Sequence, residues 1–139
     1  MSIVQTQTTS FKKELYLGVH DFSVDVLKIA LYDANADLNA DTTVYSTTHE
    51  ITGTGYSAGG EVLTGVTVSS SGYTAYVDFA NVVWSPGIFT ARCALIYNAS
   101  KSNKSIAVLD FGADKTSTAT FTIVMPVNDA NSALIRSSN

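Results

Sequence analysis

Charged side chains are scarce in this sequence. Asp, Glu, Lys and Arg make up 14% of the 139 residues, whereas a typical soluble domain has about 25%. The 12 acidic residues outnumber the 8 basic ones, which gives a net charge of −4. The only arginines, Arg92 and Arg136, are far apart in the chain. Phosphate recognition needs clustered Lys and Arg, so we expect neither nucleic acid nor an anionic membrane as a partner.

Cysteine is also rare, because Cys93 is the only one. A disulfide within the chain is therefore impossible. The residue lies in the apolar run ARCALIY, which predicts a small buried hydrophobe rather than a reactive thiol. The sequence contains no apolar run near the roughly 20 residues that a membrane span needs. Its first ten residues also lack the basic start and apolar stretch of a signal peptide, so none is expected.

Few residues suit catalysis. The two histidines, His20 and His49, each precede a carboxylate, but neighbours in a strand point to opposite faces, so both are predicted to be turn or edge residues. Asp78 and Asp110 interrupt apolar strands. We interpret them as outward-facing carboxylates rather than as the paired acids of a glycoside hydrolase. The sequence predicts neither an enzyme nor a cofactor.

Two polar segments superficially match ligand-binding loops. Between residues 33 and 41, Asp and Asn alternate with other residues as at the start of a calcium loop. Leu38 replaces the glycine and Val44 replaces the bidentate glutamate of such a loop. We therefore favour a turn-rich loop over an adventitious calcium site. The glycine-rich segment TGTGYSAGG, residues 52–60, is followed by Glu61 and a strand rather than by the Lys, Ser/Thr and helix of a phosphate loop.

Thr, Ser, Val, Ile and Tyr are abundant, and their arrangement is typical of β-structure. Turn signals separate the apolar segments, including Ser-Ser-Gly at 70–72, Ser-Pro-Gly at 85–87 and the loop GADKTST at 112–118. The spacing predicts a mainly β fold, a single antiparallel β-sandwich of jelly-roll or immunoglobulin-like type. Its strands are expected at residues 24–32, 44–51, 61–69, 73–83, 88–97, 105–111 and 119–125.

One short N-terminal helix should precede these strands. Ser10 is the predicted N-cap, Phe11 and Leu15 lie on one face at helical spacing, and Gly18 follows as a C-cap. The chain then divides into a flexible N-terminal arm or added edge strand at 1–9, a β-sandwich domain at 10–126, and a loosely held polar tail at 127–139.

Several segments resemble a family of small virion structural proteins from tailed bacteriophages. The resemblance spans residues 11–125 and rests on FKKELYLGVHDF, LKIALYDANADLNADTTVYSTTHEITGTGYSAGG, YVDFANVVWSPGIFTARCALIYN and IAVLDFGADKT. Proteins of this size and kind often decorate capsids and clamp neighbouring capsomers. The resemblance implies a capsid decoration (cement) protein that is made in the bacterial host cytoplasm and located in the virion. It brings no catalytic residue with it.

The implied partners are the major capsid protein and other copies of the chain, as a dimer or trimer. We predict that contacts come from the N-terminal segment and from the glycine-rich loop, with Ile3, Val4, Gln5, Tyr56 and Trp84 as candidate residues. The alternative is a head or tail fibre module that binds a host-surface glycan, for which Trp84 would be an exposed stacking platform.

Overall fold

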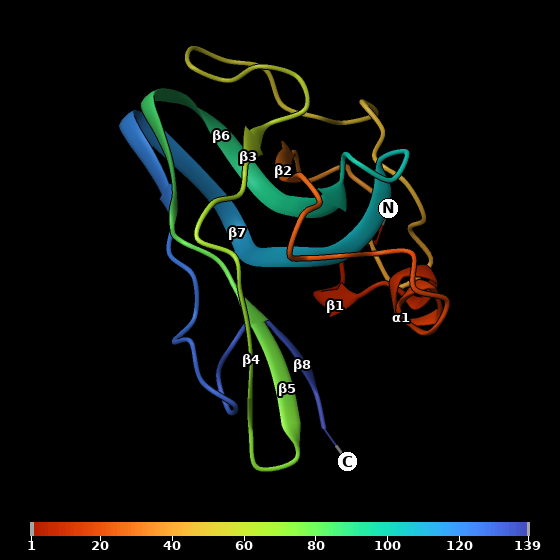
Figure 1. The fold of residues 1–139 in the computed structure, drawn as a ribbon. Coiled ribbons are helices and arrows are strands. Elements are labelled where there is room, and N and C mark those ends of the chain that lie inside the picture. The colour runs from red at the N-terminus through yellow and green to blue at the C-terminus, as the bar shows by residue number, and fades with distance from the viewer. Residues whose placement is uncertain (1, 139) are drawn as a thin grey trace.

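The computed structural model describes residues 2–138 and confirms a mainly β fold with antiparallel sheets and one short helix (Figure 1). The elements in chain order are β1 Thr6–Gln7, α1 Thr9–Tyr16, β2 Leu27–Tyr32, β3 Glu61–Val62, β4 Thr67–Ser71, β5 Thr74–Asp78, β6 Val82–Asn98, β7 Lys104–Ile123 and β8 Ile135–Ser137. They form a five-stranded sheet in the order β1-β7-β6-β2-β3 and a three-stranded sheet in the order β4-β5-β8.

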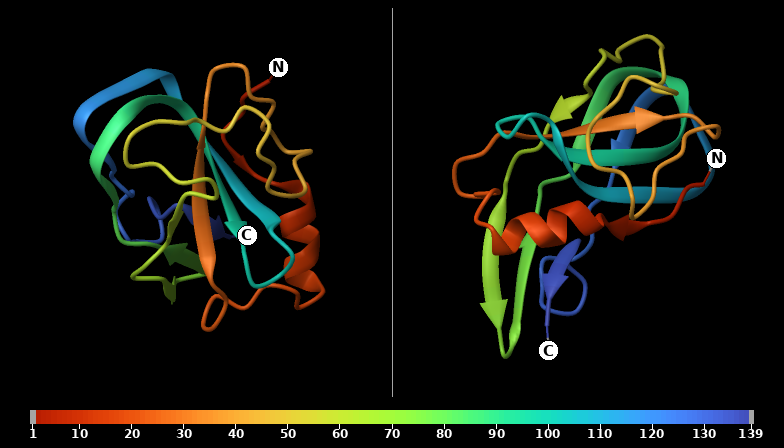
Figure 2. Two further views of the ribbon diagram at one scale, coloured as in Figure 1. Left: turned by 90° about the horizontal axis from the view of Figure 1, so that it is seen from above. Right: turned by 90° about the vertical axis from the view of Figure 1, so that its right-hand side faces the viewer.

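Two long strands dominate the larger sheet, where the sequence predicted the three shorter segments 88–97, 105–111 and 119–125. The predicted strand at 73–83 is divided between β5 and the start of β6. The predicted turn at 85–87 and the predicted loop at 112–118 are both wrong, because β6 and β7 run through them. Irregular pairing between Trp84 and Gly87 and around Arg92 takes up the extra residues. Such bulges bend strands without ending them, and the β6–β7 ribbon curls over the domain (Figure 2).

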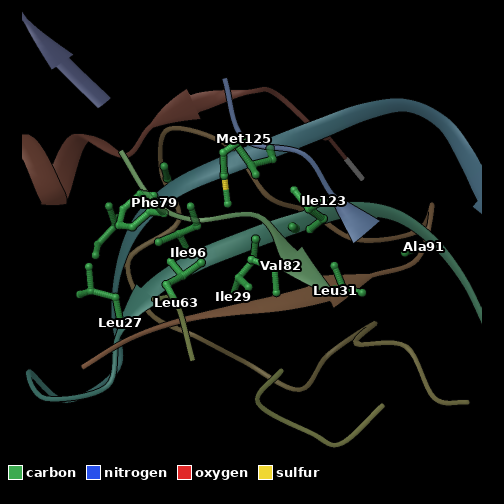
Figure 3. Close-up of a cluster of buried hydrophobic side chains, with 14 of the residues drawn as sticks. Leu27, Ile29, Leu31, Leu63, Phe79, Val82, Ala91, Ile96, Ile123 and Met125 are labelled. Carbon is green, nitrogen blue, oxygen red and sulfur yellow. The ribbon is translucent and has the colours of Figure 1, made fainter. Parts of the chain in front are cut away.

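The part of the larger sheet around β2 is buried on both faces. One cluster of apolar side chains contains Ile29 and Ile96 together with Val77 and Ile135 from the smaller sheet (Figure 3). A second cluster on the opposite face contains Tyr32 and is covered by residues of the long loop that follows β2. The predicted strand at 24–32 is confirmed as β2, which lies inside the sheet, although it starts at Leu27 rather than at 24.

The N-terminal segment is not a free arm. Thr6 and Gln7 pair with β7, and the amide of Val4 donates to the carbonyl of Leu38. Of the two predicted alternatives for residues 1–9, a flexible arm or an added edge strand, the structure contains the edge strand. The predicted N-cap is also wrong, since the buried Thr8 rather than Ser10 accepts a hydrogen bond from the Phe11 amide.

Two further predictions need correction. Residues 44–51 form isolated bridges, Val44 with Lys104 and Glu50 with Tyr32, rather than a strand. The tail is held to the domain, because β8 pairs with β5 and both Ala133 and Ile135 are buried. The hairpin around residues 70–72 is confirmed, and Gly72 adopts the positive φ of 59° that its turn requires.

Candidate interaction surface

Of the two carboxylates that interrupt apolar strands, Asp110 is half-buried and pairs with Arg92. Asp78 is buried rather than outward-facing as predicted, and its Oδ1 has no hydrogen-bond partner among residues 2–138. Within residues 2–138, no three His, Cys, Asp or Glu side chains gather to hold a metal ion.

His49 lies on the surface with Nδ1 3.5 Å from Asp33. In the loop at residues 33–41, the Asp33 and Asn39 side chains accept hydrogen bonds from nearby amides. These carboxamide and carboxylate oxygens stabilise the loop's own turns.

A buried polar chain fastens the helix to the end of β6. His20 Nε2 lies 2.9 Å from the Glu14 carboxylate, and its Nδ1 accepts from the Asn98 side chain at 2.9 Å. Asn98 also donates to Asp25, which pairs with Lys101 at 2.7 Å. Burial alone would raise the pKa of Asp25, but hydrogen bonds from the Asp21 amide, Lys101 and Asn98 outweigh it and lower the pKa to about 2.

Glu50 is the centre of a second polar cluster, which fixes the glycine-rich loop. Its carboxylate accepts hydrogen bonds from the hydroxyls of Tyr45 and Tyr56 and from the amide of Gly59. Tyr97 stacks on Tyr45 with ring centroids 4.6 Å apart and donates to the Gly59 carbonyl. Burial, together with the Glu50 charge, raises the pKa of Tyr97 to about 12 and also raises the pKa values of Tyr45 and Tyr56. These phenols therefore act as hydrogen-bond donors at neutral pH.

Two of the five candidate contact residues point inward. Trp84 is 2% exposed and packs edge-on against Phe89 and Phe121, so it offers no surface on which a sugar could stack. Tyr56 is half-buried, donates to Glu50 and accepts from the amide of Leu31.

The N-terminal candidates differ among themselves. Ile3 is half-buried and packs against the cluster that contains Tyr32. Val4 is 49% exposed. Gln5 is exposed, and its side-chain oxygen accepts from the amide of Asp110 at 3.0 Å. Val4 and Gln5 thus remain available to a partner, next to the start of the curled ribbon.

The glycine-rich loop covers one edge of that ribbon. The Ile88 amide on β6 donates to the Thr54 carbonyl at 3.0 Å. A Cβ added to Gly53 would lie 2.7 Å from the Ile88 carbonyl oxygen, and one added to Gly55 only 1.8 Å from the Pro86 oxygen. Only glycine permits such close backbone approach. The glycine run therefore closes the β6 edge and forms no phosphate cradle.

The other edge of the ribbon, along β7, is open. The first part of this edge is covered, because β1 pairs opposite Val108 and Ala107, the Thr8 amide donates to the Ile106 carbonyl, and the Ser105 amide donates to the Thr43 carbonyl. From Thr116 to Thr122, however, no backbone group outside β6 among residues 2–138 bonds to β7. Figures 1 and 2 show the end of β7 at the periphery of the domain. The sequence from Thr116 to Met125 carries no charge.

The ladder pattern tells which β7 residues expose their backbone. Residues of an antiparallel pair alternately direct their amide and carbonyl toward and away from the partner strand. Ile88 directs its amide away from β7 to Thr54, so Thr118, its opposite residue, directs its own groups outward. By the same alternation, Ala119 and Phe121, which are paired with Gly87 and Trp84, direct their groups toward β6. Even-numbered residues from Thr116 to Thr122 therefore expose unpaired amides and carbonyls.

An apolar groove of about 440 Å³ adjoins the open edge. Val124 beside it is 73% exposed. The groove is lined by residues from both halves of β7, from the N-terminal segment and from the C-terminal segment, which include Gln5, Leu109, Phe111, Phe121, Met125 and Leu134. This surface was not predicted from the sequence, because residues 112–118 were expected to form a loop. The alternating threonines of KTSTATFTI are nevertheless a strand signal.

The β4–β5 hairpin projects away from the larger sheet (Figure 1). Tyr73 at its tip is 90% exposed, and Val68 on β4 is 61% exposed. An exposed tyrosine at a hairpin tip is well suited to a contact, because its ring buries a large area at small entropic cost.

Comparisons with known protein families, with curated proteins and with solved structures found no match to this chain. Within residues 2–138, no helix has both the length and the apolar character to cross a membrane.

Proposed function

We propose that this chain is a virion structural protein of a tailed bacteriophage, a decoration (cement) protein that binds the outer capsid and stabilises the shell. The family resemblance in the sequence supplies the class. The observation that carries the proposal is the presence of two separate contact surfaces, the hairpin tip with its exposed Tyr73 and the uncharged open edge of β7 with its adjoining apolar groove. Strand addition at such an edge is a common mode of protein recognition. The major capsid protein and other copies of the chain are the proposed partners.

The arrangement of the sheets suits this role. Val77 and Ile135 of the smaller sheet share one apolar cluster with Ile29 of the larger sheet. We infer a sandwich of the jelly-roll or immunoglobulin-like type. Such a sandwich is rigid, and a protein that clamps neighbouring capsomers requires rigidity. Many weak contacts on a lattice add up through multivalency, so a small contact on each copy is sufficient.

The tip of the β4–β5 hairpin is the proposed capsid contact. The turn between β4 and β5 lies well away from the end of β7, which leaves the β7 edge free for a second partner (Figure 1). Because the tip has few neighbours, substitution there should change binding and leave the fold intact.

Binding to purified heads tests this function directly. Heads of the phage that encodes the chain, produced without it, should bind the added protein and sediment with it at hundreds of copies per particle. Tyr73→Ser should reduce occupancy at least tenfold, whereas Tyr16→Ser should not, although Tyr16 is 93% exposed. Absence of the wild-type protein from sedimented heads would contradict the proposal.

The alternative is a fibre module that binds a host-surface glycan. With Trp84 buried, Tyr73 is the exposed aromatic residue that favours this function. Glycan-array binding that Tyr73→Ser abolishes, together with a handful of copies per virion, would support the fibre module over the shell protein.

A further inference from the structure

We propose that the open edge of β7 pairs with the same edge of a second copy, antiparallel and about a two-fold axis at Ala119. The two ribbons then form one continuous sheet. This inference deepens the proposed function, on which it rests for the expectation that copies of the chain associate, and it assigns the surface through which they do so.

The first argument comes from the lengths of the strand edges. Elsewhere the sheet edges belong to β1, β3, β4 and β8, which are 2, 2, 5 and 3 residues long. Short edge strands are one way in which proteins avoid unwanted pairing, and charges or prolines are another. The exposed edge from Thr116 to Thr122 has neither protection. A long edge without protection indicates a strand partner.

The second argument identifies the partner as another copy. The edge has no charge that would select a charged peptide, and every second residue of it is threonine, a β-branched residue that pairs well with itself. A two-fold interface uses the same patch on both subunits. With the axis perpendicular to the sheet, the apolar grooves of both copies lie on one side of the joined sheet and meet beside the axis.

The third argument fixes the register. Thr116, Thr118, Thr120 and Thr122 carry the outward amides and carbonyls, so each must oppose an even-numbered residue of the other copy. An axis at Ala119 satisfies this condition for all four threonines at once: it pairs Thr118 with Thr120 and Thr116 with Thr122. The two Ala119 residues then face each other in a close pair that forms no hydrogen bonds, with Cα atoms about 4.5 Å apart. Ala119 is exposed and small enough for this position.

Self-cross-linking tests the register with single substitutions. In Ala119→Cys, the two new thiols meet at the axis, within the roughly 7 Å between Cα atoms that a disulfide allows. In the matched control, Thr116→Cys, which is exposed like Ala119, they lie about 20 Å apart, because each residue along a strand adds about 3.4 Å. The native Cys93 is buried with 0% exposure, and burial raises the pKa of its thiol to about 12, so it should not interfere.

The expected result is a dimer of the wild-type chain in analytical ultracentrifugation and a disulfide-linked dimer of Ala119→Cys on non-reducing gels, with little cross-linking of Thr116→Cys. Monomeric wild-type protein, or equal cross-linking of both variants, would overturn the inference. A trimer, or a dimer in which only Thr116→Cys cross-links, would overturn it equally. Because these measurements use the purified chain alone, failure of the dimer is distinguished from failure of capsid binding.

Discussion

The two edges of the curled β6–β7 ribbon are treated very differently. The β6 edge is closed by a glycine-rich loop whose backbone lies so near that no side chain fits between, and Glu50 with its tyrosines holds that loop in place. The β7 edge has the same ribbon geometry but no cover between Thr116 and Thr122. The comparison shows that the chain itself closes the β6 edge, whereas the β7 edge is the part of the ribbon that is available for binding. Substitutions on the closed edge should therefore affect folding, and those on the open edge should affect association.

The largest effect is expected at the closed edge. Gly55→Ala should destabilise the domain by about 4 kcal/mol, because φ is +87° and the new Cβ would overlap the Pro86 carbonyl oxygen. The matched control is Gly72→Ala at the hairpin tip, where φ is also positive but nothing lies within 4 Å of the new Cβ. It should cost only about 1 kcal/mol. Urea unfolding measures both, and equal losses would show that close approach to β6 is unimportant.

The second effect concerns the carboxylate that holds the covering loop. Glu50→Ala should cost about 2–3 kcal/mol in the free energy of unfolding, since it leaves the Tyr56 hydroxyl and the Gly59 amide without their acceptor. Glu61→Ala, which removes an exposed carboxylate from β3, should change it by less than about 0.5 kcal/mol. Hydrogen exchange in Glu50→Ala should also become faster at the Ile88 amide, which the loop protects. Unchanged exchange there would disconnect Glu50 from closure of the edge.

The third effect is a dependence of stability on pH that belongs to neither edge. The pKa of Asp25 is about 2 in the folded chain and 3.8 ordinarily. A lowered folded pKa stabilises the protein fully above pH 4, and that contribution is lost as the pH falls from about 4 to about 2. The Asp25→Asn variant should be less stable at neutral pH and should lose less stability on acidification, as thermal unfolding at several pH values would measure. Identical pH profiles would refute the assignment.

The sequence reveals the parts of the fold that depend on local pattern. Strand β2 follows from its continuous apolar run, and the hairpin turn follows from Gly72. The helix follows from the spacing of Phe11 and Leu15 with Gly18 after it, although its N-cap is Thr8 rather than Ser10. The long β6–β7 pairing could not be predicted from the sequence, because a Pro-Gly pair usually ends a strand. Here that pair lies within a bulge of β6. For the same reason Trp84 was assigned to the surface beside a turn. Its burial depends on the ribbon curling back over the core, which no local window contains.

The smallest effect on folding is expected at the open edge. Thr118 is exposed and directs its backbone groups away from β6, so Thr118→Lys removes no contact within the domain. It should change the unfolding free energy of the dilute protein by less than about 0.5 kcal/mol. In the proposed dimer, however, the substitution places two added charges near the two-fold axis, and lysine on an edge strand opposes pairing. Sedimentation should therefore show at least a tenfold weaker dimer, whereas Ser70→Lys on the short edge strand β4 should leave the dimer unchanged. A loss of stability without a loss of association would reverse the roles assigned to the two edges.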